Sequence, residues 1–406
     1  MQAYERFLKY ITYDTASDAE SATIPSTEGQ RQLGAALAQE LKQLGVLDAR
    51  MDEHGYVYGS IPQTVPGQPV IGLIAHMDTV SSVPVAPINA RIVAYAGGDI
   101  VLNEATGDVL SPKTYPELAQ LAGERLIVTD GQTLLGADDK AGIAEIMTMC
   151  EVLLSKKSAH GKVAICFTPD EEIGRGTDQF DLAAFGATFA YTLDGDALGG
   201  IEYENFNACD GTVNVRGASI HPGSAKGRMK NAALIATEFA GLLPAAETPA
   251  HTDGYEGFFH LTSIEGTEES ACARYIIRDH DSARYEARKA LFLQAGALLN
   301  TRYGAGTVAI SIEESYRNMR EKLEDKLYIV DRAKAAMQAC GVVPKVKPIT
   351  QPAQPVRPIY DSKGQPAPQM RQTSPGRVLD TRTNRYYDTV PSGLGQQVVP
   401  PPAGTR

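Results

Sequence analysis

Residues 70–80 read VIGLIAHMDTV, and they set the interpretation of the whole chain. The first six are apolar, which is typical of a β-strand that is covered on both faces. His76 and Asp78 follow at the point where such a strand ends. A histidine at a strand end is by itself more often structural than metal-binding. Asp78 favours the metal interpretation, because a metal-bound histidine usually donates its second ring nitrogen to a carboxylate or carbonyl oxygen.

Acidic segments follow three later apolar runs, and they read GADDK (136–140), TPDEE (168–172) and LDGD (193–196). Together with His76, they place an imidazole and several carboxylates at the ends of successive strands. These ligand types suit a hard or borderline divalent metal held by nitrogen and oxygen. The sequence therefore predicts a metal site at the edge of a sheet where α/β folds bind their ligands.

Each acidic segment also has a plainer interpretation. One aspartate of the pair 138–139 can simply cap the helix expected from Ala141, which leaves the other carboxylate for a metal. Glu171 and Glu172 alone are typical of a solvated helix face, although adjacent side chains diverge, so one can bind metal while the other holds water. Asp194 alone is a turn residue. Their joint occurrence at strand ends favours the metal site.

The apolar patterns before residue 205 predict strands that alternate with helices. This alternation indicates a doubly wound α/β domain with a largely parallel sheet. The expected helices and strands are helix 30–45 with Gly45 at its end, strand 56–61, strand 70–75, helix 141–154, strand 163–167 and strand 189–193.

From residue 206 to residue 313 the predicted order becomes βαββαβ, which is the ferredoxin-like arrangement of an α+β sandwich. The expected elements are strand 212–216, helix 231–243, strands 257–264 and 271–278, helix 282–300 and strand 307–312. We interpret this segment as a domain inserted into the first one. Residues 1–205 and 314–349, the latter with a helix over 321–340, then form one catalytic domain.

Composition restricts the class of protein. The 406 residues suffice for two cores, and 43% hydrophobic with 21% charged residues are globular values. A net charge of −11 argues against nucleic acid as a partner. No run of about 18 apolar residues predicts a membrane span, and the first residues do not resemble a signal peptide. Five dispersed cysteines suit reduced thiols, so we expect a cytoplasmic protein.

The composition changes after Ile349. Residues 351–406 hold ten of the 24 prolines and carry seven Lys or Arg against three Asp. Such proline-rich stretches favour extended, unpacked conformations, and no regular apolar pattern is visible. We therefore expect residues 350–406 to be a disordered tail.

Several segments of the chain resemble the peptidase T family, the tripeptide aminopeptidases among the co-catalytic dizinc exopeptidases. The similarity runs in order to about Ile349 and is carried by AHMDTV, LLGADDKAGIAEIM, FTPDEEIGRG, YTLDGD, SIHPGSAKGRMKNA, HTDGYEGFFHL and YIIRDHD. The resemblance implies a zinc-exopeptidase-like mixed sheet with an inserted lid and dimerisation domain. It also implies small peptides as substrates, two zinc ions per subunit and a homodimer formed through the inserted domain.

The resemblance implies roles for the matching residues. His76 and Asp194 bind one zinc, Asp138 bridges to the second zinc, and Glu172 binds that second zinc. Glu171 is the general base that activates the bridging water, and two metals would polarise the scissile carbonyl. Asp78 orients His76.

The resemblance also implies roles for three residues of the inserted domain. His221, which by itself is only an exposed loop histidine, stabilises the oxyanion of the reaction, often from the partner subunit. Arg278 binds a substrate carboxylate, where the plainer interpretation is a surface ion pair. Asn231 is also expected to bind substrate.

The resemblance stops after Ile349. The family continues with an Arg-Gly-Gly-Thr-Asp-Gly segment and later a Gly-Gly-His metal ligand, whereas here no histidine follows His280. The second zinc site would then keep only Asp138 and Glu172. Three hypotheses remain: an aminopeptidase impaired by the missing ligand, a non-catalytic remnant that dimerises or binds peptides, and a related metal-dependent amidohydrolase.

Overall fold

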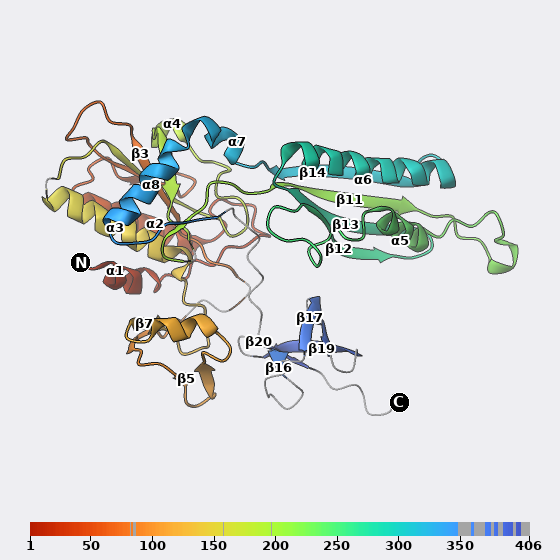
Figure 1. Ribbon diagram of the computed structural model, residues 1–406, viewed down its shortest axis with the longest axis horizontal. Helices are drawn as coiled ribbons and strands as arrows, with labels where there is room; N and C mark the ends of the chain where they lie inside the picture. Colours follow the sequence, from red (N-terminus) through yellow and green to blue (C-terminus); the bar gives the residue numbers. More distant parts are fainter. Residues whose placement is uncertain are drawn as a thin grey trace. The chain divides into compact units, whose positions relative to one another are not determined.

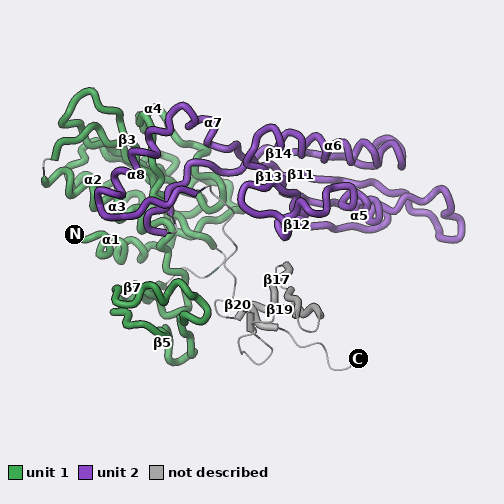
Figure 2. The backbone as a smooth tube through the Cα atoms, viewed as in Figure 1, with its two compact units in different colours: residues 1–194, 353–406 green, residues 195–352 purple. Residues whose placement is uncertain are grey.

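The computed structural model describes residues 1–81, 83, 87–156, 158–195 and 197–347, together with the backbone of five strands beyond residue 358. The chain divides into two compact units, shown in Figure 2. Unit 1 comprises Met1–Asp194 and Ala353–Arg406, and unit 2 comprises Gly195–Pro352. Each unit has its own cluster of buried apolar side chains.

A mixed five-stranded sheet forms the centre of unit 1 (Figure 1), with the strand order β1-β2-β8-β3-β9. Strands β3, β8 and β9 run parallel, whereas β2 is antiparallel to β8 and to β1. The bounds are β1 (Arg50–Met51), β2 (Val57–Ile61), β3 (Ile71–His76), β8 (Val163–Thr168) and β9 (Phe189–Thr192). Because His76 pairs with Thr168, the segments after β3 and β8 leave the sheet side by side.

Alternate residues of these strands face two different cores. Val57 and Ile61 pack in the larger core with the helices α1 (Ala3–Tyr10), α2 (Glu28–Leu44) and α3 (Ala137–Lys156). Tyr56 and Tyr58 pack instead in a smaller core that includes Phe185 of the short helix α4 (Leu182–Phe185). The sheet is therefore covered on both faces, which confirms the predicted α/β architecture.

A buried ion cluster links the helices α1, α2 and α3 of unit 1. Arg6 of α1 is 2% exposed, and its guanidinium donates to Glu40 of α2 at 3.0 Å and to Glu151 of α3 at 2.8 Å. Lys9 and Tyr10 also donate to Glu40. Because a buried charge is tolerated only with paired partners, this cluster fixes α1 against α2 and α3. Helix α1 was not predicted from the sequence.

Short antiparallel pairs between β3 and α3 were also not predicted. They are β4 (Arg91–Ala94) with β7 (Arg125–Val128), and β5 (Ile100–Asn103) with β6 (Asp108–Leu110), followed along the chain by the 3-10 helix η1 (Pro116–Leu121). Tyr95, Ile100 and Leu118 form a small apolar cluster of their own.

Unit 2 contains a βαββαβ motif with a four-stranded antiparallel sheet, in the order β12-β13-β11-β14. This order confirms the predicted ferredoxin-like arrangement. The elements are β11 (Asn207–Arg216), α5 (Ala232–Leu242), β12 (Phe258–Gly266), β13 (Ser270–Asp279), α6 (Ser282–Tyr303) and β14 (Val308–Tyr316). Inward residues of the sheet, such as Val213 and Tyr275, pack against Phe239 of α5 and Phe292 of α6.

The remaining elements of unit 2 precede or follow this motif in the sequence, except η2, which lies between β11 and α5. They are β10 (Gly200–Ile201), η2 (Pro222–Ser224), α7 (Arg320–Leu323), η3 (Glu324–Lys326), α8 (Tyr328–Ala339) and β15 (Lys345–Val346). Strands β10 and β15 pair in parallel. The contacts group residues 314–347 with unit 2, and the domain boundaries expected from the sequence, including the return of 314–349 to the catalytic domain, stay predictions.

The expected disordered tail, 350–406, lies mostly outside the described residues. Within it the structure assigns backbone strands that the composition does not predict, and they form one sheet in the order β16-β20-β19-β18-β17. Their bounds are β16 (Ile359–Tyr360), β17 (Met370–Ser374), β18 (Arg377–Asp380), β19 (Arg385–Ser392) and β20 (Gly395–Val398). Among all described helices, none combines the length and apolar character needed to cross a membrane.

Candidate active site

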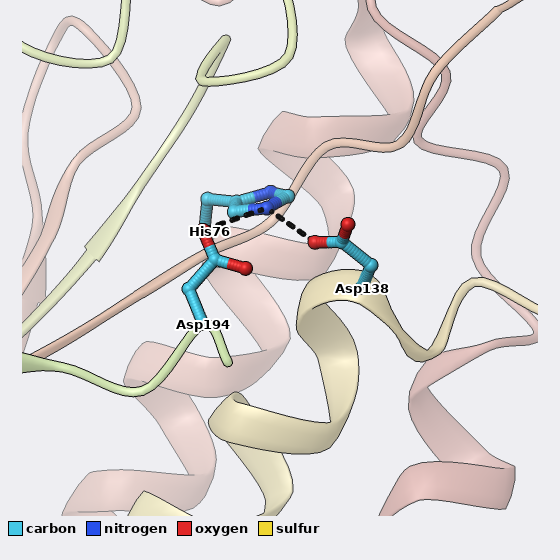
Figure 3. A group of neighbouring side chains, drawn as sticks. All are labelled: His76, Asp138 and Asp194. Atoms are coloured by element: carbon cyan, nitrogen blue, oxygen red, sulfur yellow. Dashed lines mark hydrogen bonds and ion pairs between the residues drawn. The ribbon is translucent and has the colours of Figure 1, made fainter. Parts of the chain in front are cut away.

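One histidine and two aspartates of unit 1 meet at the carboxyl end of the parallel strands. His76 ends β3, Asp138 lies at the start of α3, and Asp194 follows β9. One ligand atom from each lies within 4.8 Å of the other two, and Figure 3 shows both carboxylates beside the imidazole. One nitrogen and two carboxylate oxygens at this spacing fit the ligand chemistry of zinc and similar divalent metals.

The orientation of His76 is fixed by hydrogen bonds on both ring nitrogens. Its Nε2 lies 2.9 Å from Asp138 Oδ1 and 3.8 Å from Asp194 Oδ2, and its Nδ1 lies 3.0 Å from the carbonyl oxygen of Asp78. The imidazole is 2% exposed. A carbonyl oxygen that holds Nδ1 leaves Nε2 to face a metal, which is the usual arrangement for a histidine ligand.

The backbone at the start of α3 separates two adjacent aspartates. Asp138 and Asp139 have non-helical dihedral angles, and the peptide bond between them is cis. Asp138 faces the His76 ring, whereas Asp139 is buried and accepts the backbone N–H of His76 at 3.1 Å. Asp138 therefore lies where it could share a metal with His76, and its role as a ligand stays a prediction, whereas Asp139 holds the end of β3.

A glycine lets α3 approach the segment that carries Asp194. A Cβ atom added to Gly142 would lie 2.1 Å from the carbonyl oxygen of Leu193 and 2.4 Å from Asp139 Oδ1. Any side chain at this position would displace the backbone directly before Asp194 or the carboxylate that holds His76. Gly142 thus brings two of the three candidate ligands together.

Asp78 connects the predicted general base to the same cluster. Its buried carboxylate accepts the backbone N–H of Glu171 at 2.9 Å and that of Glu172 at 3.0 Å. Glu171 Oε2 lies 3.9 Å from His76 Nε2. Asp78 thus holds the loop after β8, in addition to the link to His76 that the sequence predicted. Glu172 is not among the described residues that form the three-ligand group.

Burial of several acids so close together disfavours their charged forms. Burial raises the pKa of Asp139 to about 8, and burial together with the charge of Asp138 raises the pKa of Glu172 to about 7. The pKa of Glu171 is also raised, mainly by burial. A general base needs a pKa near the working pH, so the direction of this shift suits the role predicted for Glu171.

The three candidate ligands are strongly coupled. Burial lowers the pKa of His76, but its hydrogen bonds to Asp138 and Asp78 outweigh burial and raise that pKa to about 11. The same hydrogen bond from His76 lowers the pKa of Asp138, whereas burial and the charge of Asp138 raise the pKa of Asp194. A positive charge is thus favoured at this position, and a divalent cation would replace the proton of His76.

The three site residues predicted in the inserted domain all lie in unit 2. His221 precedes η2, is exposed, and its Nδ1 accepts the backbone N–H of Gly223 at 3.2 Å. Asn231 caps α5, since its side chain accepts the N–H of Leu234 at 3.1 Å. Arg278 lies on β13, between the rings of Phe206 and Tyr316, with its guanidinium 5.8 Å from each centroid. Their roles in catalysis stay predictions.

Comparison with known proteins gives the family. The chain is 52% identical to peptidase T of Geobacillus thermodenitrificans (strain NG80-2) over 348 residues, which cover 85% of each chain. It is 48% identical to peptidase T of Halothermothrix orenii, also over 348 residues that cover 85% of each chain. Residues 203–307 match the family described as Peptidase dimerisation domain.

Solved structures share the fold. The aminopeptidase PepT of Bacillus cereus superposes with a TM-score of 0.67 at 23% identity, covering 86% of this chain and 84% of that one. A tripeptidase of Staphylococcus aureus gives 0.66 at 18% identity, over 86% and 83%. A dinuclear metal binding peptidase of the M20 family from Bacillus subtilis gives 0.53 at 11% identity, over 86% and 83%.

A mixed sheet with a cluster of histidine and acids at its strand ends, combined with a ferredoxin-like dimerisation domain, defines a peptidase with the M20 fold. Within that class, the sequence identity to the peptidase T relatives over most of the chain shows the family. The chain belongs to the peptidase T family.

Proposed function

We propose that the chain is a metal-dependent aminopeptidase that releases the N-terminal residue of tripeptides, with zinc as the metal. The observation that carries the proposal is the convergence of His76, Asp138 and Asp194 within 4.8 Å, in a chain of the peptidase T family. These three residues would hold one metal ion. A bound metal would polarise the scissile carbonyl and lower the pKa of a water molecule.

The protein's own groups supply the proton transfers. Glu171, whose raised pKa suits an acid and base, takes the proton of the attacking water and gives it to the leaving amine. Asp78 keeps Glu171 in place through the backbone N–H that its carboxylate accepts. The carbonyl oxygen and the carboxylate of Asp78 also lie next to Nδ1 of His76. Asp78 therefore positions both Glu171 and His76.

A second metal would have fewer protein ligands. Asp138 and Glu172 can contribute to it, and the chain has no histidine after His280. Catalytic zinc sites normally have three protein ligands, so we propose one tightly bound zinc per chain and reduced turnover. The match to the peptidase T relatives spans 348 residues, close to the 349 that precede the change in composition.

The Peptidase dimerisation domain at 203–307 supports a homodimer as the working form. Short peptides are the substrates that the family implies, and His221, Asn231 and Arg278 are the residues proposed to contact them. Sedimentation of the full chain would measure the assembly, and a strictly monomeric chain with full activity would contradict the dimer.

Zinc content and tripeptide hydrolysis, measured on the same samples, test the metal and base roles. Glu171→Gln should retain zinc and lose about 10²- to 10⁴-fold in kcat, because it removes only the proton acceptor. Asp138→Ala should lose zinc as well. Glu20→Gln, an exposed change of the same kind in unit 1, serves as the control.

Three results would contradict the proposal. Equal zinc content and activity in both variants and the parent would reject the assigned roles. Two tightly bound zinc ions in the parent would reject the incomplete second site. Hydrolysis of N-acylated substrates in preference to free tripeptides would indicate an amidohydrolase instead of an aminopeptidase.

A further inference from the structure

The loop that carries Glu171 and Glu172 begins at a residue with unusual backbone geometry. Asp170 has a φ of +57°, and it is the one non-glycine position with positive φ within the described parts of the chain. For a residue with a Cβ atom, the left-handed conformation is unfavourable, although aspartate tolerates it better than most. Such a conformation persists only where the surroundings enforce it.

Those surroundings are supplied by the N-terminal end of α2, far away in the sequence. The Asp170 carboxylate is fully buried and accepts the backbone N–H of Ser26 at 2.8 Å, the hydroxyl of Ser26 at 2.5 Å and the side-chain amide of Gln30 at 2.7 Å. The amide oxygen of Gln30 in turn accepts the backbone N–H of Asp170 at 3.1 Å. Gln30 therefore binds both the side chain and the backbone of the left-handed residue.

The same residue organises the turn that follows it. The carbonyl oxygen of Asp170 accepts the N–H of Arg175 at 2.9 Å, and the Arg175 guanidinium donates to the carbonyl oxygens of Ser21 and Thr23. The next two N–H groups, those of Glu171 and Glu172, both point to the carboxylate of Asp78. The loop is thus held from one side by the segment before α2 and from the other by the residue that orients His76.

We propose that Gln30, with Ser26, is a positioning residue for Glu171 and Glu172. It enforces the left-handed conformation of Asp170, which directs the following two N–H groups to Asp78 and the two glutamates to the metal site. Gln30 is itself fully buried, and its side-chain amide donates to Ser26, Thr27 and Asp170. The predicted effect of Gln30 on catalysis rests on the proposed function. Its predicted effect on the loop conformation does not.

The geometry predicts the effect of each substitution. Gln30→Met keeps the size of the side chain and removes both hydrogen bonds to Asp170. Gln30→Glu keeps the acceptor for the Asp170 N–H but places a second buried carboxylate against the first, without a donor between them. Adding Asp170→Asn to Gln30→Glu restores one donor and one acceptor to the pair, since asparagine also tolerates the left-handed conformation. The double variant should therefore recover what Gln30→Glu loses.

Cleavage by trypsin after Arg175, followed in zinc-free full-length protein, reports the loop without using activity. Gln30→Met and Gln30→Glu should be cut there about tenfold faster than the parent, because local opening becomes easier. The double variant Gln30→Glu/Asp170→Asn should be protected again. Gln32→Met is the matched control, since Gln32 is an exposed glutamine on the same helix. Ile61→Val, a core change away from the loop, controls for a general loss of stability.

Zinc-loaded samples give the second readout. Gln30→Met should lower kcat on the order of 10- to 100-fold with little change in KM, because a misplaced general base affects the reaction step more than binding. Zinc held by His76, Asp138 and Asp194 should stay bound. The double variant should regain most of the lost kcat.

The outcomes separate the two proposals. A parent chain that hydrolyses no tripeptide would reject the proposed function, and protection of Arg175 would still decide the role of Gln30. Unchanged protection and kcat in Gln30→Met would overturn the positioning role. So would equal loss of protection in Ile61→Val, or a double variant no better than Gln30→Glu alone.

Discussion

Each unit gathers a group of polar side chains at one end of its sheet, and the chemistry of the two groups differs. In unit 1 the group consists of His76 and several acids, at the ends of β3, β8 and β9 and at the start of α3. In unit 2 it consists of amides, where the chain enters β11 and leaves β14. Asn207 donates to the carbonyl oxygens of Asp279 and His280 and accepts the N–H of Asn318. Asn318 also donates to the carbonyl oxygen of His280, and its side-chain oxygen accepts the N–H groups of Asn205 and Arg320.

The difference separates a structural polar group from a functional one. Neutral amides that match donors to acceptors stabilise a fold, because every buried polar atom has a partner. Acids that face one another raise each other's pKa and oppose folding, and they are retained where a cation or a reaction needs them. The acids of unit 1 therefore indicate a functional site. The amides of unit 2 instead have a structural role, because they connect chain segments through hydrogen bonds.

Removal of the central amide should have the largest effect on stability. Asn207→Ala removes the amide donor to the Asp279 carbonyl oxygen and the acceptor for the Asn318 N–H, and it takes one of two donors from the His280 carbonyl oxygen. Each buried group that loses its partner costs about 1–3 kcal/mol, so we expect a loss of about 3 kcal/mol. Urea unfolding followed by circular dichroism measures it. Asn214→Ala, an exposed change on the same strand, should stay within about 0.5 kcal/mol of the parent. Equal effects of the two changes would remove the distinction between the units.

The acids of unit 1 should show the opposite behaviour through pH. An unfolded carboxyl group ionises near pH 4, whereas burial raises the pKa of Asp139 to about 8 and that of Glu172 to about 7. A raised folded pKa means that the folded chain keeps protons that the unfolded chain has lost. Stability is therefore lost as pH rises through this range. His76, with its pKa raised to about 11, adds to the loss above about pH 6.5.

Urea midpoints in EDTA, from pH 5 to pH 8, test this expectation. The parent should become less stable as pH rises, and Asp139→Asn should flatten the dependence, because its amide oxygen still accepts the His76 N–H. Saturating zinc should also flatten it. A parent that becomes more stable towards pH 8 without metal would show that the acids are not coupled as the structure indicates.

Part of this site could be predicted from the sequence because strand ends are forced together. The apolar run before His76 and the one before Glu171 form adjacent parallel strands. The polar residues that follow these strands therefore meet at one edge of the sheet. The roles of Asp170 and Gln30 could not be predicted. These roles depend on the positive φ of Asp170 and on its hydrogen bond to Gln30, 140 residues away in the sequence. No local sequence pattern predicts either feature.

Other parts of the fold were missed for similar reasons. Helix α1 is only eight residues long, and it is fixed by the buried Arg6, a residue type normally expected on the surface. The antiparallel pairs between β3 and α3 have strands of three or four residues, too short for a clear alternation. Gly142 reads as an ordinary helical glycine, although tertiary contacts with Leu193 require it.

A single methyl group at that glycine should weaken the site from outside the ligand set. Gly142→Ala brings a Cβ atom against the carbonyl oxygen of Leu193, and overpacking of this kind costs about 1–3 kcal/mol. It should also reduce zinc affinity, because the backbone before Asp194 must move. Gly241→Ala, at an exposed position of α5 with open space around it, should instead stabilise by a few tenths to 1 kcal/mol. Unchanged zinc affinity in Gly142→Ala would show that the clash is relieved away from Asp194.

The smallest effect concerns Asn231, for which the sequence predicts substrate binding and the structure shows a helix cap. Asn231→Ala removes the acceptor for the Leu234 N–H and should cost about 1 kcal/mol. Asn231→Asp keeps a good cap, so its stability should equal that of the parent. If the amide also contacts substrate, Asn231→Asp should still raise KM for a tripeptide, because a carboxylate cannot donate a hydrogen bond. Urea midpoints and KM measured on both variants separate the two roles, and an unchanged KM in Asn231→Asp would leave Asn231 as a cap alone.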